Sequence, residues 1–203
     1  MDCNLLIDVL PLTIPVGGRN LHIETNFRAA ILFEMMVQNG DVPDHEKAQY
    51  AIDLFFPDGF PKPENEQKEA LEGMLWFYTC GKSEQDEKQS AGTGKGPGIQ
   101  KRIYDYDVDA PLIYAAFLSQ YGIDLQDIPY LHWWKFNALF QGLSENQKIV
   151  EIMGYRAINL STIKNKAERQ HYAQMQAKYA LPDNRSTQEK AAAAGALFGG
   201  MFR

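Results

Sequence analysis

Apolar residues recur at helical spacing along most of the chain and alternate with polar residues only near its beginning. Residues 10–16 and 21–25 are short apolar runs on either side of Gly17-Gly18. Paired glycines supply the positive φ angles that a tight turn needs, so this stretch is predicted to be a β-hairpin. Helical spacing predicts seven helices after it. Thr25 or Asn26 is expected to cap the first of them and Ser161 or Thr162 the last, and Gly122 is expected to end the fourth. Six cover about 26–38, 44–56, 64–80, 110–121, 130–141 and 162–180, and one begins at a capping box of Ser144 and Gln147.

Two stretches lack this pattern and divide the chain. Residues 82–101 are almost entirely charged, small polar, Gly or Pro. Such a segment buries too little apolar surface to offset the entropy of ordering it, so a flexible loop is expected. The predicted organisation is a hairpin with helices over 1–81, this loop over 82–101, a helical core over 102–182 and a mobile tail over 183–203. The predicted fold class is mainly α: a helical bundle-like domain with an N-terminal β-hairpin and a flexible internal loop.

Composition and charge narrow the class of protein. No apolar run approaches the roughly 18 residues that span a bilayer, and the beginning of the chain does not resemble a secretory signal. The two cysteines are expected to be free thiols in a reducing cytoplasm. The net charge is −6, yet residues 156–203 carry eight basic and three acidic residues. That asymmetry is typical either of an interaction arm or of a solvated basic helix. Because the whole chain is acidic, nucleic-acid binding is not favoured.

Motifs that suggest chemistry fail on inspection. Gly94-Lys95 is followed by glycine, so the hydroxyl that a phosphate loop uses to hold magnesium is missing. Asp105, Asp107 and Asp109 resemble the start of a calcium loop, but its later glycine and glutamate are absent. Asp109 is therefore interpreted as a helix cap. The four histidines lack metal-ligand spacing. We expect no enzyme activity, no metal and no cofactor.

The helix over 130–141 is apolar nearly all round its circumference, which indicates burial on several sides. Within it, His132 is interpreted as a core histidine with a satisfied hydrogen bond. Trp133 and Trp134 point about 100° apart on a helix. Core packing of both tryptophans is favoured, and an interface role for one of them is the alternative.

This aromatic region also carries a resemblance to a known family. The run Tyr-Asp-Tyr-Asp-Val-Asp-Ala-Pro-Leu-Ile-Tyr that starts at Tyr104, and the run Tyr-Leu-His-Trp-Trp-Lys-Phe that starts at Tyr130, are its most specific parts. Together with Val16-Gly-Gly-Arg and the Lys-Tyr-Ala-Leu-Pro that ends at Pro182, they resemble the bacteriophage "gene product fifteen" family of Gram-positive tailed phages and prophages. The resemblance covers roughly residues 5–182.

The resemblance implies a gene between those for the tail tube and the tape-measure protein. Proteins from that position act as tail-assembly chaperones that bind the tape-measure protein during long-tail morphogenesis. The implied partners are the tape-measure protein, the tail tube protein, a neighbouring tail-assembly protein and further copies of the chain itself. The implied location is the cytoplasm of the bacterial host. The alternative is a minor structural or completion protein that stays in the virion tail.

The last helix and the tail supply the candidate partner-binding residues. The helix over 162–180 has a narrow apolar stripe and several Lys and Arg side chains, which is typical of a projecting helix or of one that receives a partner. The tail carries apolar side chains on a glycine-rich end. The candidate partner-binding residues are Met175, Tyr179, Leu197, Phe198, Met201 and Phe202.

Overall fold

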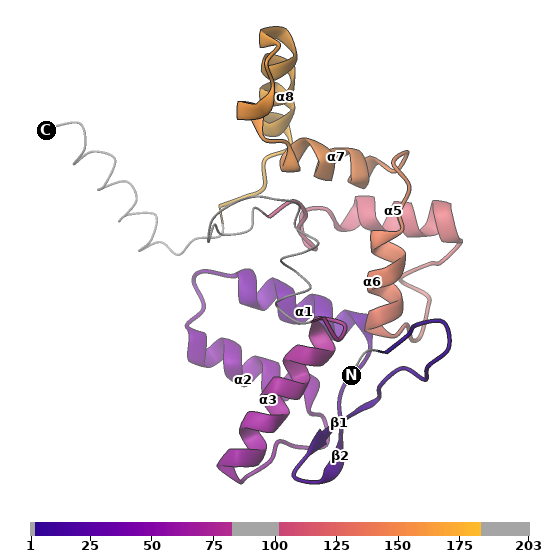
Figure 1. The fold of residues 1–203 in the computed structure, drawn as a ribbon, viewed down its shortest axis with the longest axis vertical. Coiled ribbons are helices and arrows are strands. Elements are labelled where there is room, and N and C mark those ends of the chain that lie inside the picture. The colour runs from indigo at the N-terminus through magenta and orange to yellow at the C-terminus, as the bar shows by residue number, and fades with distance from the viewer. Residues whose placement is uncertain (1–2, 83–101, 184–203) are drawn as a thin grey trace, which may run out of the picture. The chain divides into compact units, whose positions relative to one another are not determined.

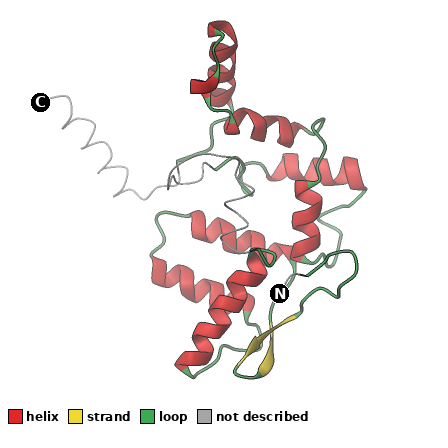
Figure 2. Ribbon diagram, viewed as in Figure 1, coloured by secondary structure: helices red, strands yellow, loops and turns green. Residues whose placement is uncertain are grey.

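The computed structural model describes residues 3–82 and 102–183. Within these ranges the chain forms seven α-helices, a short 3-10 helix and one antiparallel hairpin (Figures 1 and 2). The predicted fold class, mainly α with an N-terminal β-hairpin, is confirmed. The chain divides into two compact units. The described part of unit 1 is 3–82, 132–134 and 183, and that of unit 2 is 102–131 and 135–182. Most of the predicted loop and all but the first residue of the predicted tail lie outside the described residues.

The hairpin of unit 1 packs on a helix. Strands β1 (Thr13–Val16) and β2 (Arg19–His22) pair antiparallel, and Gly17 and Gly18 turn between them with φ of 56° and 74°. Ile14 of β1 is fully buried against helix α3 (Glu64–Tyr78). A Cβ atom at Gly73 of α3 would lie 2.8 Å from Cδ1 of Ile14, so a glycine is needed there for the close approach. The hairpin therefore has a fixed place on α3.

Residues 3–82 of unit 1 contain two further helices. Helix α1 (Phe27–Gln38) begins at Asn26, whose side chain accepts a hydrogen bond from the backbone N–H of Arg28, as the capping prediction required. Helix α2 (Asp44–Phe55) packs against α1. The ring of Phe55 lies 5.4 Å from that of Phe33 and 6.4 Å from that of Phe77, both edge-on. One aromatic cluster thus connects α1, α2 and α3.

Residues 132–134 belong to the core of unit 1. Trp133 and Trp134 are 2% and 5% exposed, so both are core residues as predicted. Their indole N–H groups donate to the backbone carbonyls of Tyr78 and Phe77, each at 2.7 Å. The last carbonyls of a helix have no partner within the helix. The two tryptophans therefore satisfy the C-terminal end of α3 while they fill the core beside it.

Unit 2 is built around stacked aromatic rings. Helix α5 (Ala110–Tyr121) ends at Gly122, which takes the left-handed conformation that a helix stop requires. Helix α6 (Trp133–Gln141) continues into this unit beyond Trp134. The ring of Phe136 stacks on that of Phe117 at 4.9 Å and 11°, and on that of Phe140. The core of unit 2 thus lies between α5 and α6.

Three predicted helix starts are wrong by several residues. Helix α6 begins at Trp133 instead of residue 130, because His132 pairs as an isolated bridge with Asn26. Helix α7 (Lys148–Ala157) follows Gln147 without a side-chain cap, and the backbone N–H of Ser144 donates to the side chain of Gln120. The predicted capping box is therefore absent. For α6 and α7, a contact with a residue far along the chain replaces the predicted local start.

The last helix, α8 (Lys166–Lys178), also starts later than predicted. The predicted caps Ser161 and Thr162 lie in the 3-10 helix η1 (Leu160–Thr162). Asn165 caps α8 instead, because its side chain accepts from the backbone N–H groups of the second and third residues that follow it. Helix α8 packs on α7 and η1, and none of its residues is buried. The narrow apolar stripe predicted for this helix thus corresponds to a helix with no buried residue.

Candidate functional site: exposed apolar and basic surfaces

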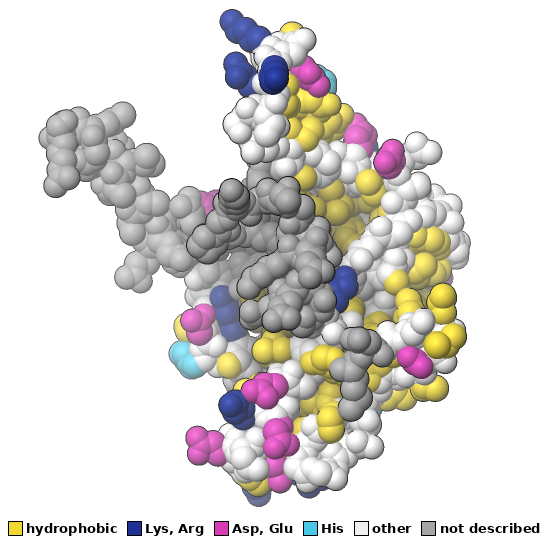
Figure 3. Space-filling model, viewed as in Figure 1, with side chains coloured by type: hydrophobic (Ala, Val, Ile, Leu, Met, Phe, Trp, Pro, Cys, Tyr) yellow, Lys and Arg dark blue, Asp and Glu magenta, His cyan; other side chains and the backbone are white. Residues whose placement is uncertain are grey.

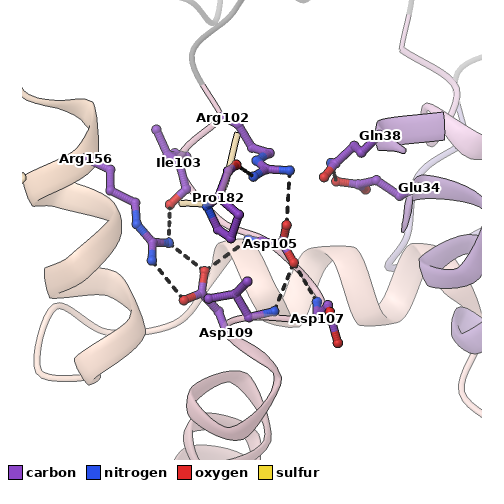
Figure 4. Close-up of polar contacts among 10 residues, drawn as sticks. Glu34, Gln38, Arg102, Ile103, Asp105, Asp107, Asp109, Arg156 and Pro182 are labelled. Carbon is purple, nitrogen blue, oxygen red and sulfur yellow. Dashed lines mark hydrogen bonds and ion pairs between the residues drawn. The ribbon is translucent and has the colours of Figure 1, made fainter. Parts of the chain in front are cut away.

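Two of the three aspartates that resemble a calcium loop, Asp105 and Asp109, have carboxylates that bind other groups of the protein (Figure 4). The carboxylate of Asp105 accepts from the backbone N–H groups of Asp107 and Val108, at 2.7 and 3.0 Å. Its other oxygen lies 3.1 Å from the guanidinium of Arg102. Asp105 therefore stabilises the turn that leads into α5.

Asp109 occupies the N-cap position of α5, but its side chain does not cap the helix. Its carboxylate instead pairs with the guanidinium of Arg156, and both side chains are less than 10% exposed. Arg156 also donates to the backbone carbonyls of Ile103 and Tyr179, at 3.0 and 2.7 Å. The prediction that the side chain of Asp109 caps the helix is wrong, because its carboxylate binds the guanidinium of Arg156 and the backbone N–H of Asp105 instead. No spacing rule in the sequence indicated this pair.

His132 and Cys80 are also used by the fold. Nε2 of His132 lies 3.0 Å from the backbone carbonyl of Pro11, and Nδ1 accepts from the backbone N–H of Trp134. The histidine is 3% exposed, which confirms the prediction of a satisfied core histidine. Burial raises the pKa of the Cys80 thiol to about 12. A thiol with so little thiolate is a poor nucleophile near neutral pH.

The predicted partner-binding residues fall into two groups. Leu197, Phe198, Met201 and Phe202 lie outside the described residues. Met175 lies in α8 and Tyr179 directly follows it. Both side chains are half-buried, and α8 packs on α7. The ring of Tyr179 stacks on that of Tyr155 at 6.0 Å and 4°. Lys148 and Lys178 each place Nζ within 5.5 Å of the centre of that ring. Their role in partner binding stays a prediction.

The remaining surface of α8 is basic and polar. Lys164, Lys166 and Arg169 are exposed and form no salt bridge with another residue of the described ranges. Only Glu168 opposes them on the helix. Figure 3 shows Lys and Arg side chains gathered over α8. The basic balance that the sequence indicated is therefore presented on one solvent-exposed helix.

The most exposed apolar surface is in unit 1, just before the hairpin. Leu6, Ile7 and Val9 are 91%, 79% and 92% exposed, and Leu5 and Leu12 are 41% and 52% exposed. Figure 3 shows hydrophobic side chains over this segment, on the right. We refer to residues 5–12 as the N-terminal apolar segment. Exposing such side chains forgoes roughly 1.5–3 kcal/mol each that burial would contribute.

This segment is held in one conformation by its own polar residues. The backbone N–H of Asn4 donates to the carboxylate of Asp8 at 2.7 Å, and the side chain of Asn4 accepts from the N–H of Leu6. The backbone N–H of Asp8 donates a hydrogen bond to the backbone carbonyl of Asn4 at 2.9 Å. The sequence analysis missed this surface because the residues lack both helical and strand spacing. The signal was a run of three apolar residues closed on both sides by Asn4 and Asp8.

Within residues 3–82 and 102–183, no group of three or more His, Cys, Asp or Glu side chains is placed to hold a metal ion. In the same ranges no helix is long and apolar enough to cross a membrane.

Comparison with known proteins supports the resemblance. No curated protein and no solved structure gives a significant match. The family model described as bacteriophage Gp15 protein matches residues 6–181, which include both units and the whole aromatic block of α5 and α6. A match over so much of the chain shows that it belongs to the bacteriophage Gp15 protein family and is a phage structural or assembly protein.

Proposed function

We propose that the protein is a tail-assembly chaperone that binds the tape-measure protein while a long phage tail is built. Family membership supports the coarser class of phage structural or assembly protein. The observation that carries the finer proposal is the N-terminal apolar segment, whose Leu6, Ile7 and Val9 are almost fully exposed. Contiguous exposed apolar surface on a protein marks an interaction site.

The geometry of this segment suits a long apolar partner. The bonds between Asn4 and Asp8 fix the turn before any partner arrives, so little entropy is lost when the apolar side chains bind. Leu, Ile and Val side chains pack between the ridges of an amphipathic helix without requiring a particular hydrogen-bonding partner. The tape-measure protein implied by the family resemblance is long and helical, and such a chain needs cover for its apolar side until the tube surrounds it.

Action by binding, without catalysis, is part of the same proposal. Four of the groups that could serve as acid, base or nucleophile are committed to the fold. Asp105 and Asp109 are paired with arginines, His132 bonds to backbone groups at both ring nitrogens, and Cys80 is held as a thiol. We place this binding in the host cytoplasm during assembly.

Co-expression with the tape-measure protein of the same phage tests the proposal. We expect the wild-type protein to keep the tape-measure protein in the supernatant, and Leu6→Gln/Ile7→Gln/Val9→Gln to lose most of this effect. Leu118→Gln is the matched control, because Leu118 is an exposed apolar residue of α5. Equal solubilisation by wild type and the triple variant would contradict a role for the segment. No solubilisation by wild type, with the protein found at fixed copy number in purified virions by mass spectrometry, would favour a minor tail or completion protein.

A further inference from the structure

Helix α8 presents a face that nothing in its unit covers. Tyr172, Met175 and Gln176 are half-buried, and the side-chain amide of Gln176 donates to the backbone carbonyls of Tyr155 and Ile158. This side of the helix therefore packs on α7. Successive residues of a helix are about 100° apart, so the opposite face carries Lys166, Gln170, Ala173 and Ala177. All four are exposed.

The uncovered face of α8 has two properties that suit another helix. Its alanines keep the backbone accessible to a close neighbour, since they add little side-chain bulk. Its charge is positive, because Lys166 lies on it and Arg169 borders it, one turn before Ala173, while Glu168, the only acidic residue of the helix, lies away from it. An acidic helical surface is the complementary partner.

Unit 1 carries such a surface on α3. Glu64, Lys68, Glu72 and Leu75 follow one another at spacings of four, four and three residues, so they form one stripe along the helix. All four are exposed, and Leu75 is 49% exposed. Lys68 is the only cation of the helix, and its ammonium lies 3.8 Å from Glu72 with both side chains largely in solvent. The stripe is therefore acidic with one exposed apolar side chain.

We propose that α8 of one copy of the chain docks on the α3 stripe of a second copy. Lys166 and Arg169 face the glutamates, and the small Ala173 and Ala177 leave room for Leu75. The two surfaces differ from each other, so the contact is heterologous, and the assembly has one free α8 at one end and one free α3 stripe at the other. Further copies add at these two ends. The inference uses neither the N-terminal apolar segment nor the proposed function.

Sedimentation velocity of the full chain measures this association. We expect the weight-average sedimentation coefficient to rise with protein concentration at about 0.1 M NaCl and to stay at the monomer value at about 1 M NaCl, where the Debye length falls from about 10 to about 3 Å. Lys166→Glu/Arg169→Glu should weaken the association by roughly tenfold or more, because charge reversal turns attraction into repulsion. Glu64→Lys/Glu72→Lys should weaken it as much.

A mixture of the two variants is the decisive measurement. The α3 variant retains a basic α8, and the α8 variant retains an acidic α3 stripe, so one wild-type contact forms between them. We expect the mixture to associate when neither variant does alone. Lys135→Glu, which reverses the charge of an exposed lysine of α6, is the control and should leave association unchanged.

Three outcomes would overturn the inference. The first is a wild-type chain that stays monomeric at all concentrations in about 0.1 M NaCl. The second is association that neither charge reversal weakens. The third is a mixture of folded variants that remains monomeric, because that result would assign the effect of the charges to contacts within a single chain. Circular dichroism of each variant shows whether it is folded.

Discussion

Helices α6 and α8 have opposite relations to the rest of the protein. In α6, Trp133, Trp134 and Phe136 are at most 5% exposed, and the two indole N–H groups bond to the end of α3. In α8 no residue is buried, although the helix is the longer of the two. The family resemblance was strongest around α6, whereas the chain's basic charge is strongest around α8.

The difference separates the part of the molecule that specifies the fold from the part that is available to partners. Burying the large aromatic side chains of α6 supplies a major share of the stabilising apolar contact. A helix of 13 residues with no buried side chain is marginal by itself in water, so α8 depends on its few anchors. Helix α8 thus contributes little to the core. This is what we expect of a helix whose role is to bind.

The largest effect is expected from the buried ion pair that anchors the end of α8. Asp109→Ala leaves Arg156 charged and buried without its partner, and Arg156 also holds the backbone carbonyl of Tyr179. We expect a loss of about 3–5 kcal/mol in the free energy of unfolding, measured with urea. The control is Asp109→Leu/Arg156→Met, which replaces both charges by apolar groups and should recover most of the loss. A single variant as stable as wild type would show that the pair does not anchor α8.

The next largest effect is expected in the rates at which a buried and an exposed cysteine react with a thiol reagent. Burial raises the pKa of Cys80 to about 12, so the thiolate fraction at pH 8 is about 10⁻⁴. We expect Cys80 to react with a disulfide reagent roughly a hundredfold more slowly than a cysteine at exposed position 173 of α8, even after allowing for the greater intrinsic reactivity of a more basic thiolate. The rate for Cys80 is measured in Cys3→Ser, in which it is the remaining cysteine. The rate for position 173 is measured in Cys3→Ser/Cys80→Ser/Ala173→Cys.

The raised pKa of Cys80 also determines how the stability of the protein changes with pH. Burial raises the folded-state pKa of Cys80 above its ordinary value of 9.0, so the folded protein favours the neutral thiol. Its contribution to stability is complete below pH 9 and is lost as the pH rises toward 12, because the unfolded chain then gains the thiolate first. If Cys80 and the cysteine at position 173 are labelled at equal rates at pH 8, the labelling prediction is wrong and the end of α3 opens readily.

A smaller effect is expected when one indole of α6 is removed. Trp134→Phe keeps an aromatic ring, removes one of the two hydrogen bonds that the carbonyl of Phe77 accepts (the backbone N–H of Cys80 donates the other) and opens a small cavity. We expect a loss of about 2–3 kcal/mol in the free energy of unfolding. Trp76→Phe is the control, because Trp76 is only half-buried, and it should cost less. Equal losses would assign the effect to ring size alone.

The sequence predicted the elements whose causes are local. The Gly17-Gly18 turn, the Asn26 cap and the Gly122 stop each depend on the conformation of one or two neighbouring residues, and each was predicted correctly. The burial of both tryptophans followed from apolar residues around the whole circumference of the predicted helix.

The errors have causes far along the chain. The Asp109 cap was wrong because its partner Arg156 lies 47 residues away. The start of α6 was wrong because His132 pairs with Asn26, more than a hundred residues earlier. For the candidate site, the basic and solvent-exposed character of α8 was predictable from its narrow stripe. The N-terminal apolar segment was not, since neither helical nor strand periodicity marks an exposed turn.

The smallest expected effect comes from the same substitution made in both helices. Ala138→Gly in α6 and Ala173→Gly in α8 each change an exposed alanine, with an intrinsic cost of about 1 kcal/mol to a helix. In α6 that cost should appear in full in the free energy of unfolding, because the helix is anchored by Trp133, Trp134 and Phe136. In α8 the free energy of unfolding should fall by less than about 0.5 kcal/mol, while amide hydrogen exchange accelerates within 166–178 only, since a weakly anchored helix opens locally. Acceleration confined to α8 without a matching loss in the urea midpoint would establish that α8 opens independently of the core. A full loss of about 1 kcal/mol from Ala173→Gly would instead make α8 part of the cooperative fold and would remove the contrast between the two helices.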